Sequence, residues 1–215
     1  MKNLILKELK LNVKPPVFLL SLLGAMVLIP NYPIIVGMGY CVMQIFIYLQ
    51  ISQANLSQEF TSTLPVKRSD IVGSIVAVVA TFQLITLLVG AICAPVAKVI
   101  YPTGNIVGLD ANLAFFGIAF ACFAVFNTIF LPNYFKTGYK YGLPLLLGLV
   151  GFVVTYGICE TLVQVVPSLT ALLDGYAAQG IWARAIVLAA GMAAYALCTA
   201  FATKRAVKKF EKVSL

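Results

Sequence analysis

The stretch IVGSIVAVVATFQLITLLVGAIC, residues 71–93, decides the fold class of this chain. It contains no charged residue, and it exceeds the roughly 20 residues that a helix needs to cross about 30 Å of hydrocarbon. Further apolar runs lie on both sides of it. The predicted spans cover residues 16–29, 34–51, 71–93, 111–131, 143–166 and 185–203. The sequence therefore predicts an all-α integral membrane protein, with six transmembrane helices in a single domain over residues 1–215.

The composition leads to the same class. Apolar residues make up 61% of the 215 residues and charged residues 10%, against roughly 25% charged in an average soluble protein. So few charges cannot cover the surface of a soluble domain of this size. Histidine is absent, which removes the commonest general base and the usual metal ligand. We therefore expect no catalytic residue and no metal site in this chain.

The first span, 16–29, is short for a full crossing. It becomes long enough only if Pro15 and Pro16 form its first helical turn, where proline is tolerated. The turn Pro30–Pro33 then leads directly into the second span. The alternative for this pair of segments is a re-entrant hairpin.

Ahead of the first span, residues 1–14 have the pattern of an amphipathic helix. On a helical projection one face is apolar and a neighbouring face is lined by lysines. The apolar face holds Ile5, Leu6, Leu9 and Val13, and the basic face holds Lys7, Lys10 and Lys14. We expect this segment to lie on the cytoplasmic leaflet, where its lysines meet anionic lipid headgroups. The alternative is an ordinary basic flank that only fixes topology.

The distribution of charge predicts the orientation. With both termini inside, thirteen of the fifteen Lys and Arg residues lie on the inner side, and only Lys98 and Arg184 lie outside. The positive-inside rule then places both termini, the 52–70 loop and a basic tail, 204–215, in the cytoplasm. The net charge of +8 thus marks orientation, and no nucleic-acid partner is expected.

The longest inner loop, residues 52–70, opens with the polar, helix-compatible run QANLSQEF. Leu56 and Phe60 are four residues apart, so they would share one face of a short helix, with Glu59 elsewhere around it. Further on, Pro65 ends any preceding helix. The helix of the third span can be capped by Ser69 or Asp70. Considered alone, this pattern is equally typical of a charged, capped loop.

The other inner loop, residues 131–142, reads LPNYFKTGYKYG and is crowded with aromatic residues for a solvent-exposed loop. Tyrosines at the headgroup level are ordinary interfacial residues. This density of aromatic side chains also suits a docking surface for a protein partner.

The N-terminal basic helix, the six spans and these two loops together resemble the small permeases of type-2 ATP-binding-cassette (ABC) exporters. In that family a Leu-Pro-Val-x-Arg-x-x-Ile-Val pattern commonly precedes the third span, and residues 64–72 match it. A proline followed by Phe-Lys-x-Gly-Tyr commonly joins the fourth and fifth spans. The matching residues here are Pro132, Phe135, Lys136, Gly138 and Tyr139. The acidic-Lys-Arg ending often seen after that pattern is absent, because Tyr141 and Gly142 follow Lys140. The chain is similar to the branch that exports phenol-soluble modulins and related amphipathic peptide toxins.

This resemblance implies a permease of the bacterial plasma membrane that exports amphipathic or antimicrobial peptides. A second permease copy, identical or homologous, would complete the pathway, and two cytoplasmic ABC ATPase subunits would bind below. The 52–70 segment would hold the coupling helix, which enters a cleft of the ATPase. The sequence has no Gly-x-x-x-x-Gly-Lys-Ser/Thr phosphate loop. ATP and magnesium are therefore expected on the partner chain, and no cofactor on this one.

The residues expected to contact the ATPase lie in the two inner loops. In the first loop they are Leu56, Glu59, Phe60, Leu64, Pro65, Lys67, Arg68 and Asp70. In the second loop they are Pro132, Phe135, Lys136, Tyr139 and Lys140.

Three of the spans carry polar residues at helical spacing. These are Tyr40, Gln44 and Tyr48 in the second span, Gln83 and Thr86 in the third, and Tyr156, Glu160 and Gln164 in the fifth. Such stripes either form hydrogen bonds between helices or line the substrate pathway. Glu160 is the only acidic residue inside a predicted span. It is expected to pair with Lys98 or Arg184, to contact a cationic group of the substrate, or to carry a proton.

Small residues predict close helix packing in the last two spans. They are Gly148, Gly151 and Gly157 in the fifth span, and Ala189, Ala190, Gly191, Ala193 and Ala194 in the sixth. A surface for a second copy is the alternative role.

Two other function classes compete with the exporter permease. The substrate-capture subunit of an energy-coupling-factor vitamin importer has a similar size and also borrows ATPases. The two inner loops favour the exporter. A membrane-embedded enzyme is disfavoured, because the chain has no histidine and only one carboxylate within a span.

Overall fold

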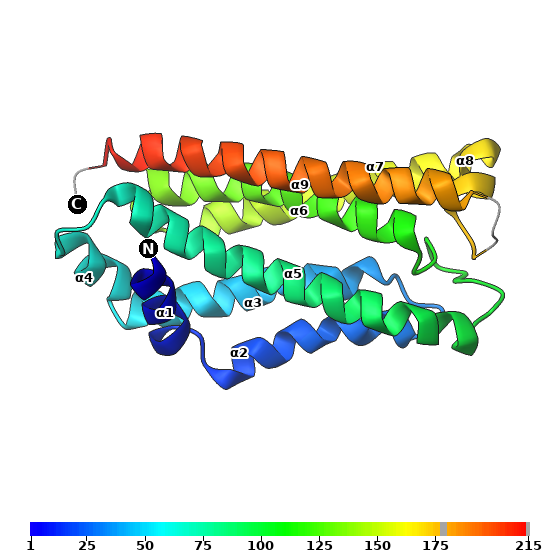
Figure 1. The fold of residues 1–215 in the computed structure, drawn as a ribbon, viewed down its shortest axis with the longest axis horizontal. Helices are drawn as coiled ribbons and strands as arrows, with labels where there is room; N and C mark the ends of the chain where they lie inside the picture. Colours follow the sequence, from blue (N-terminus) through cyan, green and yellow to red (C-terminus); the bar gives the residue numbers. More distant parts are fainter. Residues whose placement is uncertain (177–179, 214–215) are drawn as a thin grey trace.

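The computed structural model describes residues 1–176 and 180–213, and its elements are helical (Figure 1). They are α1 (Lys2–Leu11), α2 (Pro15–Leu19), the 3₁₀ helix η1 (Leu20–Leu28), α3 (Ile35–Ala54), α4 (Ser57–Thr63), α5 (Arg68–Ile100), α6 (Leu113–Lys136), α7 (Gly142–Val165), α8 (Pro167–Leu173) and α9 (Ile181–Phe210). The helices α3, α5, α6, α7 and α9 are long and apolar enough to span a membrane, and the bent N-terminal pair, α1 with α2–η1, supplies a sixth candidate. The predicted all-helical membrane fold is confirmed.

The bundle has two distinct ends. Both chain termini lie at the end that carries α4, and α8 lies at the opposite end (Figure 1). We call these the α4 end and the α8 end. The positive-inside rule predicts that the α4 end faces the cytoplasm.

The first span gains length from its geometry. It consists of five residues in α2 and nine in the 3₁₀ helix η1. A rise of roughly 1.5 Å per α-helical residue and 2.0 Å per 3₁₀ residue gives about 26 Å, against about 21 Å for a wholly α-helical segment. Asn105 Nδ2, in the loop at the α8 end, donates to Tyr32 O at 2.9 Å just beyond this span. The segment therefore runs the length of the bundle, which favours a crossing over a re-entrant hairpin.

Several helix boundaries differ from the predicted ones. The helix α5 extends beyond residues 71–93 at both ends, and α6 continues past residue 131 into the predicted loop. The helix α9 continues to Phe210, so the predicted basic tail 204–215 is mostly helix, and its last residues, 214–215, lie outside the described residues. The helix α8 was not predicted. Apolarity marks only the part of a helix inside hydrocarbon, whereas its backbone hydrogen bonds continue into water.

The helices α6 and α9 lie side by side and approach each other closely (Figure 1). A Cβ placed on Gly191 of α9 would overlap the backbone carbonyl oxygen of Gly117 in α6. Beside this contact, Gln83 Nε2 donates to Asn127 Oδ1 at 2.8 Å, and the Tyr195 hydroxyl donates to Gln83 Oε1 at 2.8 Å. All three side chains are buried. Because unpaired polar groups are costly in hydrocarbon, this network fixes the register of α5, α6 and α9.

At the α8 end, Asn112 caps the start of α6 and also bonds to the end of α8 and the outer loop that follows it. Its Oδ1 accepts hydrogen bonds from Ala114 N and Phe115 N at 2.9 and 3.1 Å. Its Nδ2 donates to the carbonyl oxygens of Leu173 and Gly175 at 2.8 and 3.1 Å. One side chain thus caps α6 and ties it to the end of α8.

We expect Asn112→Ala to lower the free energy of unfolding by about 2–3 kcal/mol, because it removes a helix cap and two further hydrogen bonds worth about 1 kcal/mol each. Asn112→Ser keeps the acceptor that caps the helix and loses the donor. Its free energy of unfolding should therefore fall about half as far as that of Asn112→Ala. Thermal unfolding in detergent measures both variants. Equal melting temperatures for the two would show that the cap contributes nothing.

Candidate functional site

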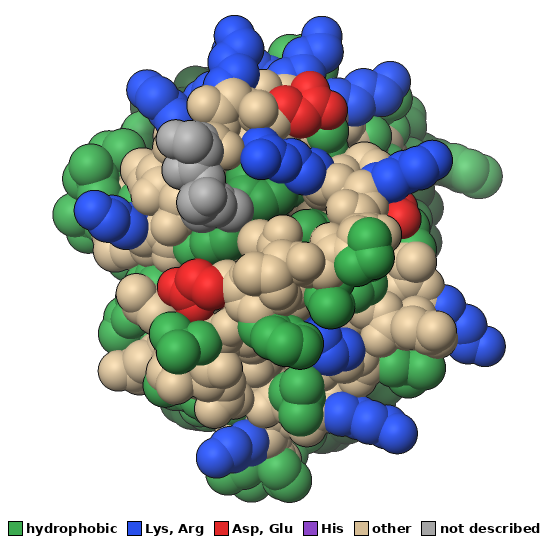
Figure 2. Space-filling model, turned by 90° about the vertical axis from the view of Figure 1, so that its left-hand side faces the viewer, with side chains coloured by type: hydrophobic (Ala, Val, Ile, Leu, Met, Phe, Trp, Pro, Cys, Tyr) green, Lys and Arg blue, Asp and Glu red, His purple; other side chains and the backbone are tan. Residues whose placement is uncertain are grey.

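The α4 end presents an apolar ridge. We define the α4 ridge as Leu56, Phe60 and Leu64, whose side chains are 62%, 64% and 38% exposed. Phe60 N donates to Leu56 O at 3.0 Å, so these two residues stand one helical turn apart as predicted. Figure 2 views this end of the molecule and shows Lys and Arg side chains around its edge, with exposed apolar side chains between them. Clustered apolar side chains on an otherwise polar surface mark a protein-interaction site.

Other residues of the first inner loop also face outward. Glu59, Pro65 and Lys67 are exposed. The N-cap of α5 is Lys67, and no side chain caps this helix. The prediction that Ser69 or Asp70 caps it is therefore wrong. The helix begins at Arg68, which places both side chains inside its first turn, where the Asp70 carboxylate interacts favourably with the helix dipole.

Arg68 points into its own chain. Its Nη1 donates to the carbonyl oxygens of Phe210 and Val213 at 2.6 and 3.1 Å. The guanidinium carbon lies 5.2 Å from the centre of the Phe210 ring. The last carbonyls of a helix have no helical N–H partner, and Arg68 supplies one at the end of α9. In this structure Arg68 therefore holds the end of α9, and its expected contact with the ATPase stays a prediction.

Most aromatic residues of the second inner loop are buried, which corrects the prediction that they form an exposed docking surface. Pro132, Phe135 and Tyr139 are buried, and Tyr141 is half-buried. The rings of Phe135 and Tyr139 each lie 5.4 Å from the ring of Phe210. The last turn of α9 covers them, and burial raises the pKa of the Tyr139 hydroxyl to about 12. Of the residues of this loop that were expected to contact the ATPase, Lys136 and Lys140 are exposed.

A buried polar cluster joins α1 to α3 and α4. The carboxylate of Glu8 accepts hydrogen bonds from the Tyr48 hydroxyl and from Asn12 Nδ2, both at 2.7 Å. It also forms an ion pair with Lys7 Nζ at 2.7 Å. From α1, Lys7 Nζ and Asn12 Nδ2 also donate to side chains of α4, at 2.6 and 2.9 Å. We define the polar joint as Lys7, Glu8, Asn12, Tyr48, Ser57 and Thr61.

The predicted pathway residues divide into two groups. Gln44, Tyr48, Gln83 and Thr86 are fully buried. Gln44 Nε2 donates to Ser21 Oγ at 2.8 Å, and Thr86 Oγ1 donates to a backbone carbonyl one turn earlier at 2.9 Å. Gln83 bonds to Asn127 of α6, and Tyr48 belongs to the polar joint. The contacts of Gln44, Tyr48 and Gln83 therefore match the interpretation of hydrogen bonds between helices, whereas Thr86 bonds within α5. The assignment of these four residues to a substrate pathway stays a prediction.

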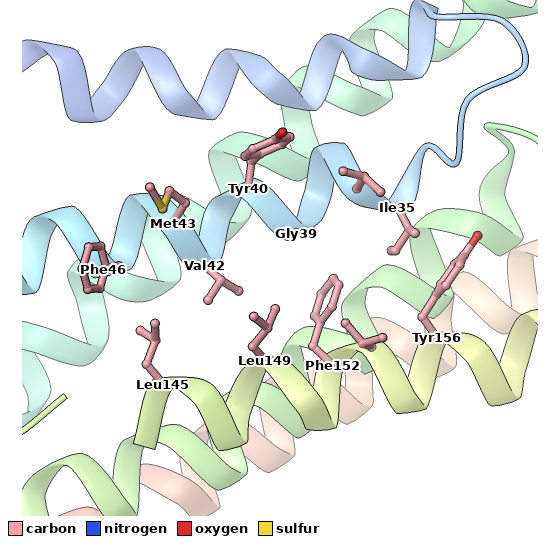
Figure 3. Close-up of a pocket in the computed structure, with 12 residues that line it drawn as sticks. Ile35, Gly39, Tyr40, Val42, Met43, Phe46, Leu145, Leu149, Phe152 and Tyr156 are labelled. Carbon is pink, nitrogen blue, oxygen red and sulfur yellow. The ribbon is translucent and has the colours of Figure 1, made fainter. Parts of the chain in front are cut away.

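Tyr40 and Tyr156, in contrast, line a groove of about 530 Å³ between α3 and α7 (Figure 3). Figure 3 shows side chains of the two helices pointing toward each other, with Val42 of α3 above Leu149 of α7. Apart from the two tyrosines, the side chains that line it are apolar. The lining residues are Ile35, Val36, Gly39, Tyr40, Val42, Met43, Phe46, Leu145, Leu149, Phe152, Val153 and Tyr156.

Glu160 and Gln164 lie beyond the groove, toward the α8 end. Glu160 Oε1 accepts a hydrogen bond from the Tyr156 hydroxyl at 3.2 Å, and Gln164 donates to a carboxylate of the outer loop at 3.2 Å. Arg184 donates to the backbone carbonyls of Leu172 in α8 and Asp174 in the loop, and Lys98 lies over an aromatic ring. Of the three alternatives for Glu160, pairing with Lys98 or Arg184 is therefore not what the structure shows, because Glu160 bonds to Tyr156. Within residues 1–176 and 180–213, no group of three His, Cys, Asp or Glu side chains is placed to hold a metal ion.

A family model described as "ABC-2 family transporter protein" matches residues 3–204. That range includes both the α4 ridge and the groove. The chain belongs to the ABC-2 transporter family. It is accordingly a multi-pass membrane permease, the non-catalytic transport subunit that pairs with an ABC ATPase. Membership of the ABC-2 family favours this class over the vitamin-importer subunit. Neither the curated proteins nor the solved structures gave a match.

Sequence reasoning missed the polar joint of this ABC-2 permease. It considered the apolar and basic faces of residues 1–14 and passed over Glu8, the one acidic residue in that segment. A lone acid among lysines was the available signal, since a carboxylate that becomes buried needs a charged or hydrogen-bonding partner. Asn127 was missed in the same way. An asparagine in the middle of a predicted span needs a partner, because hydrocarbon offers none.

Proposed function

We propose that this ABC-2 permease exports amphipathic peptides. The observation that carries the proposal is the groove between α3 and α7, where, among the residues that line it, only Tyr40 and Tyr156 bear polar side-chain groups. An amphipathic helix can place its apolar face in such a groove and leave its polar face to water. A hydrophilic ion or sugar would find too few polar partners there to replace its hydration.

The proposed transporter binds two ABC ATPase subunits, which carry ATP and magnesium, at the α4 end. The α4 ridge supplies an apolar anchor, and the exposed residues Glu59, Pro65 and Lys67 surround it. A few large anchors of this kind provide most of the binding energy of a protein interface. The exposed lysines Lys136 and Lys140 lie at the same end and extend the charged rim of the surface.

A second permease copy, identical or homologous, completes the proposed pathway. In the most apolar stretches of α7 and α9, only 22% and 17% of the residues are buried within the chain. These two helices therefore present long uncovered faces. Because α7 forms one wall of the groove, a second copy packed on this side would separate the groove from lipid.

Filling the groove tests the proposed substrate route. A Cβ placed on Gly39 would meet only the Phe152 ring, at 4.0 Å, so this position has room for a larger side chain. We expect Gly39→Leu to occupy part of the groove and to lower ATP-dependent peptide export roughly tenfold, the effect of about 1.4 kcal/mol of lost binding. The measurement is uptake of a fluorescent amphipathic helical peptide into inside-out vesicles that contain the permease and its ATPase.

A control variant separates filling of the groove from a general effect of substituting Gly39. Gly39→Ala adds a single methyl group where there is space for it and should retain export. Unchanged export by Gly39→Leu would contradict the proposed route.

A further inference from the structure

The outward side of α1 combines basic and apolar side chains. Lys2, Leu6 and Lys10 recur at four-residue spacing along α1 and are exposed, Leu6 to 43%, and Lys14 is exposed just beyond the helix. The axis of α1 is bent by 94° from the α2–η1 segment. Because that segment runs along the bundle, α1 lies across the end at which the first span begins. Exposed lysines and an exposed leucine on a helix in this position suit the surface of an anionic membrane.

The inward side of α1 is bonded to α4 through the polar joint. Lys7 Nζ donates to Thr61 Oγ1 at 2.6 Å and to Ser57 O at 3.3 Å. Asn12 Nδ2 donates to Ser57 Oγ at 2.9 Å. Glu8, which bonds to both Lys7 and Asn12, is only 2% exposed. Since breaking a buried charged contact leaves its partner without a hydrogen bond, α1 and α4 are expected to move together.

The side of α1 that faces α4 also adjoins the α4 ridge. Leu11 of α1 and Phe60 of the ridge line one groove together with Lys7, Asn55 and Ser57. Whatever holds α1 against the bilayer thus acts close to the surface that we assign to the ATPase.

We propose that anionic phospholipid of the inner leaflet binds the outward side of α1 and, through the polar joint, fixes the position of α4. The charge is complementary, because Lys2 and Lys10 on the outward side of α1 and Lys14 just beyond the helix are exposed, while the single acid of α1, Glu8, is buried. The exposed Leu6 favours a phospholipid over a soluble phosphate, since it can enter the acyl region beside the headgroups. That lipid would regulate the docking of the ATPase rests on the proposed role of α4 as the docking site. The test of lipid binding itself needs neither ATPase nor peptide.

Hydrogen exchange of the α4 amides, residues 57–63, tests this inference on the full-length permease alone. We expect exchange in α4 to slow about tenfold when phosphatidylglycerol is added to phosphatidylcholine nanodiscs, because a fixed helix opens less often. Inorganic phosphate added to phosphatidylcholine nanodiscs should leave the exchange unchanged. Equal exchange in the two lipid compositions would overturn the proposal, and an equal response to inorganic phosphate would overturn the assignment to lipid.

Two pairs of substitutions separate the binding of lipid to α1 from the effect of that binding on α4. Lys10→Gln with Lys14→Gln should remove the effect of phosphatidylglycerol on both α1 and α4. Lys7→Met with Asn12→Ala should keep the slower exchange of α1 and lose that of α4. If α4 still responds in this second pair, the polar joint is not the route.

The matched control is Lys204→Gln with Lys208→Gln, which removes the same charge from exposed positions on α9. This pair should respond to phosphatidylglycerol as the unmodified chain does. If this pair loses the slower exchange of α4, the permease responds to phosphatidylglycerol through its total charge and not through α1. The surface pairs change exposed side chains only, so the test survives even if the polar-joint variant does not fold.

Discussion

Phe60→Glu is expected to weaken the association between this permease and its ABC ATPase by roughly thirtyfold or more while leaving the permease folded. Phe60 is 64% exposed, so the substitution removes little internal packing. Loss of an interface anchor costs about 2 kcal/mol or more, which raises Kd roughly thirtyfold. Desolvation of the new carboxylate adds to that cost. The dissociation constant of the detergent-solubilised permease for the ATPase measures the effect, and thermal unfolding of the permease checks its fold.

Gln53→Glu is the matched control for charge. Gln53 is exposed at the end of α3, outside the α4 ridge, so this variant adds the same negative charge at the same end of the molecule. Its Kd should stay within about twofold of the original value, because exposed charges away from an interface core contribute little. Binding by Phe60→Glu that equals binding by Gln53→Glu would show that the α4 ridge is not the anchor.

The shared helical face of Leu56 and Phe60 could be predicted from the sequence, because it depends on local geometry. Two apolar residues four positions apart share a helical face wherever the short helix forms. Burial of Phe135 and Tyr139 could not be predicted in the same way. It depends on Phe210, which lies in the last turn of a different helix. No pattern within the loop itself records that contact.

The apolar runs predicted the spans well, because transfer into hydrocarbon is a property of each segment by itself. They did not predict that Arg68 begins α5, or that it reaches across to Phe210. They also did not show how polar residues pair. Gln83 and Asn127 each need a partner in the bilayer, but only the three-dimensional arrangement shows that they bond to each other. Glu8 pairs with Tyr48 for the same reason.

The close packing predicted for small residues holds at some positions and not at others. Gly191 of α9 meets the backbone of Gly117, whereas a Cβ on Gly157 of α7 would have nothing within 4 Å. The two glycines are alike in sequence, since both lie in apolar spans among other small residues. Which one permits a helix crossing depends on the neighbour that each helix faces.

Gly191→Leu is expected to cause the largest loss of stability among single substitutions in the bundle. A Cβ at this position would overlap Gly117 O, and a Cβ on Gly117 would lie 2.5 Å from Val187 O. Backbone atoms cannot rotate aside as side chains can, so α6 and α9 must separate. Separation also strains the bond from Tyr195, one turn along α9, to Gln83. Overpacking and one unpaired buried group together cost on the order of 2–6 kcal/mol. Melting temperature and monodispersity in detergent measure the loss.

Gly157→Leu makes the same substitution at an open position and should be neutral or stabilising by up to about 1 kcal/mol, because leucine has the higher helix propensity. Gly191→Ala should still be destabilised, since the overlap already involves the Cβ. Gly117→Ala pushes the same two backbones apart, so once either substitution has separated them the other meets less resistance. The double variant should therefore lose less stability than the sum of the two single variants. Strictly additive losses would show that the two glycines act separately, and that their crossing is not the contact that holds α6 against α9.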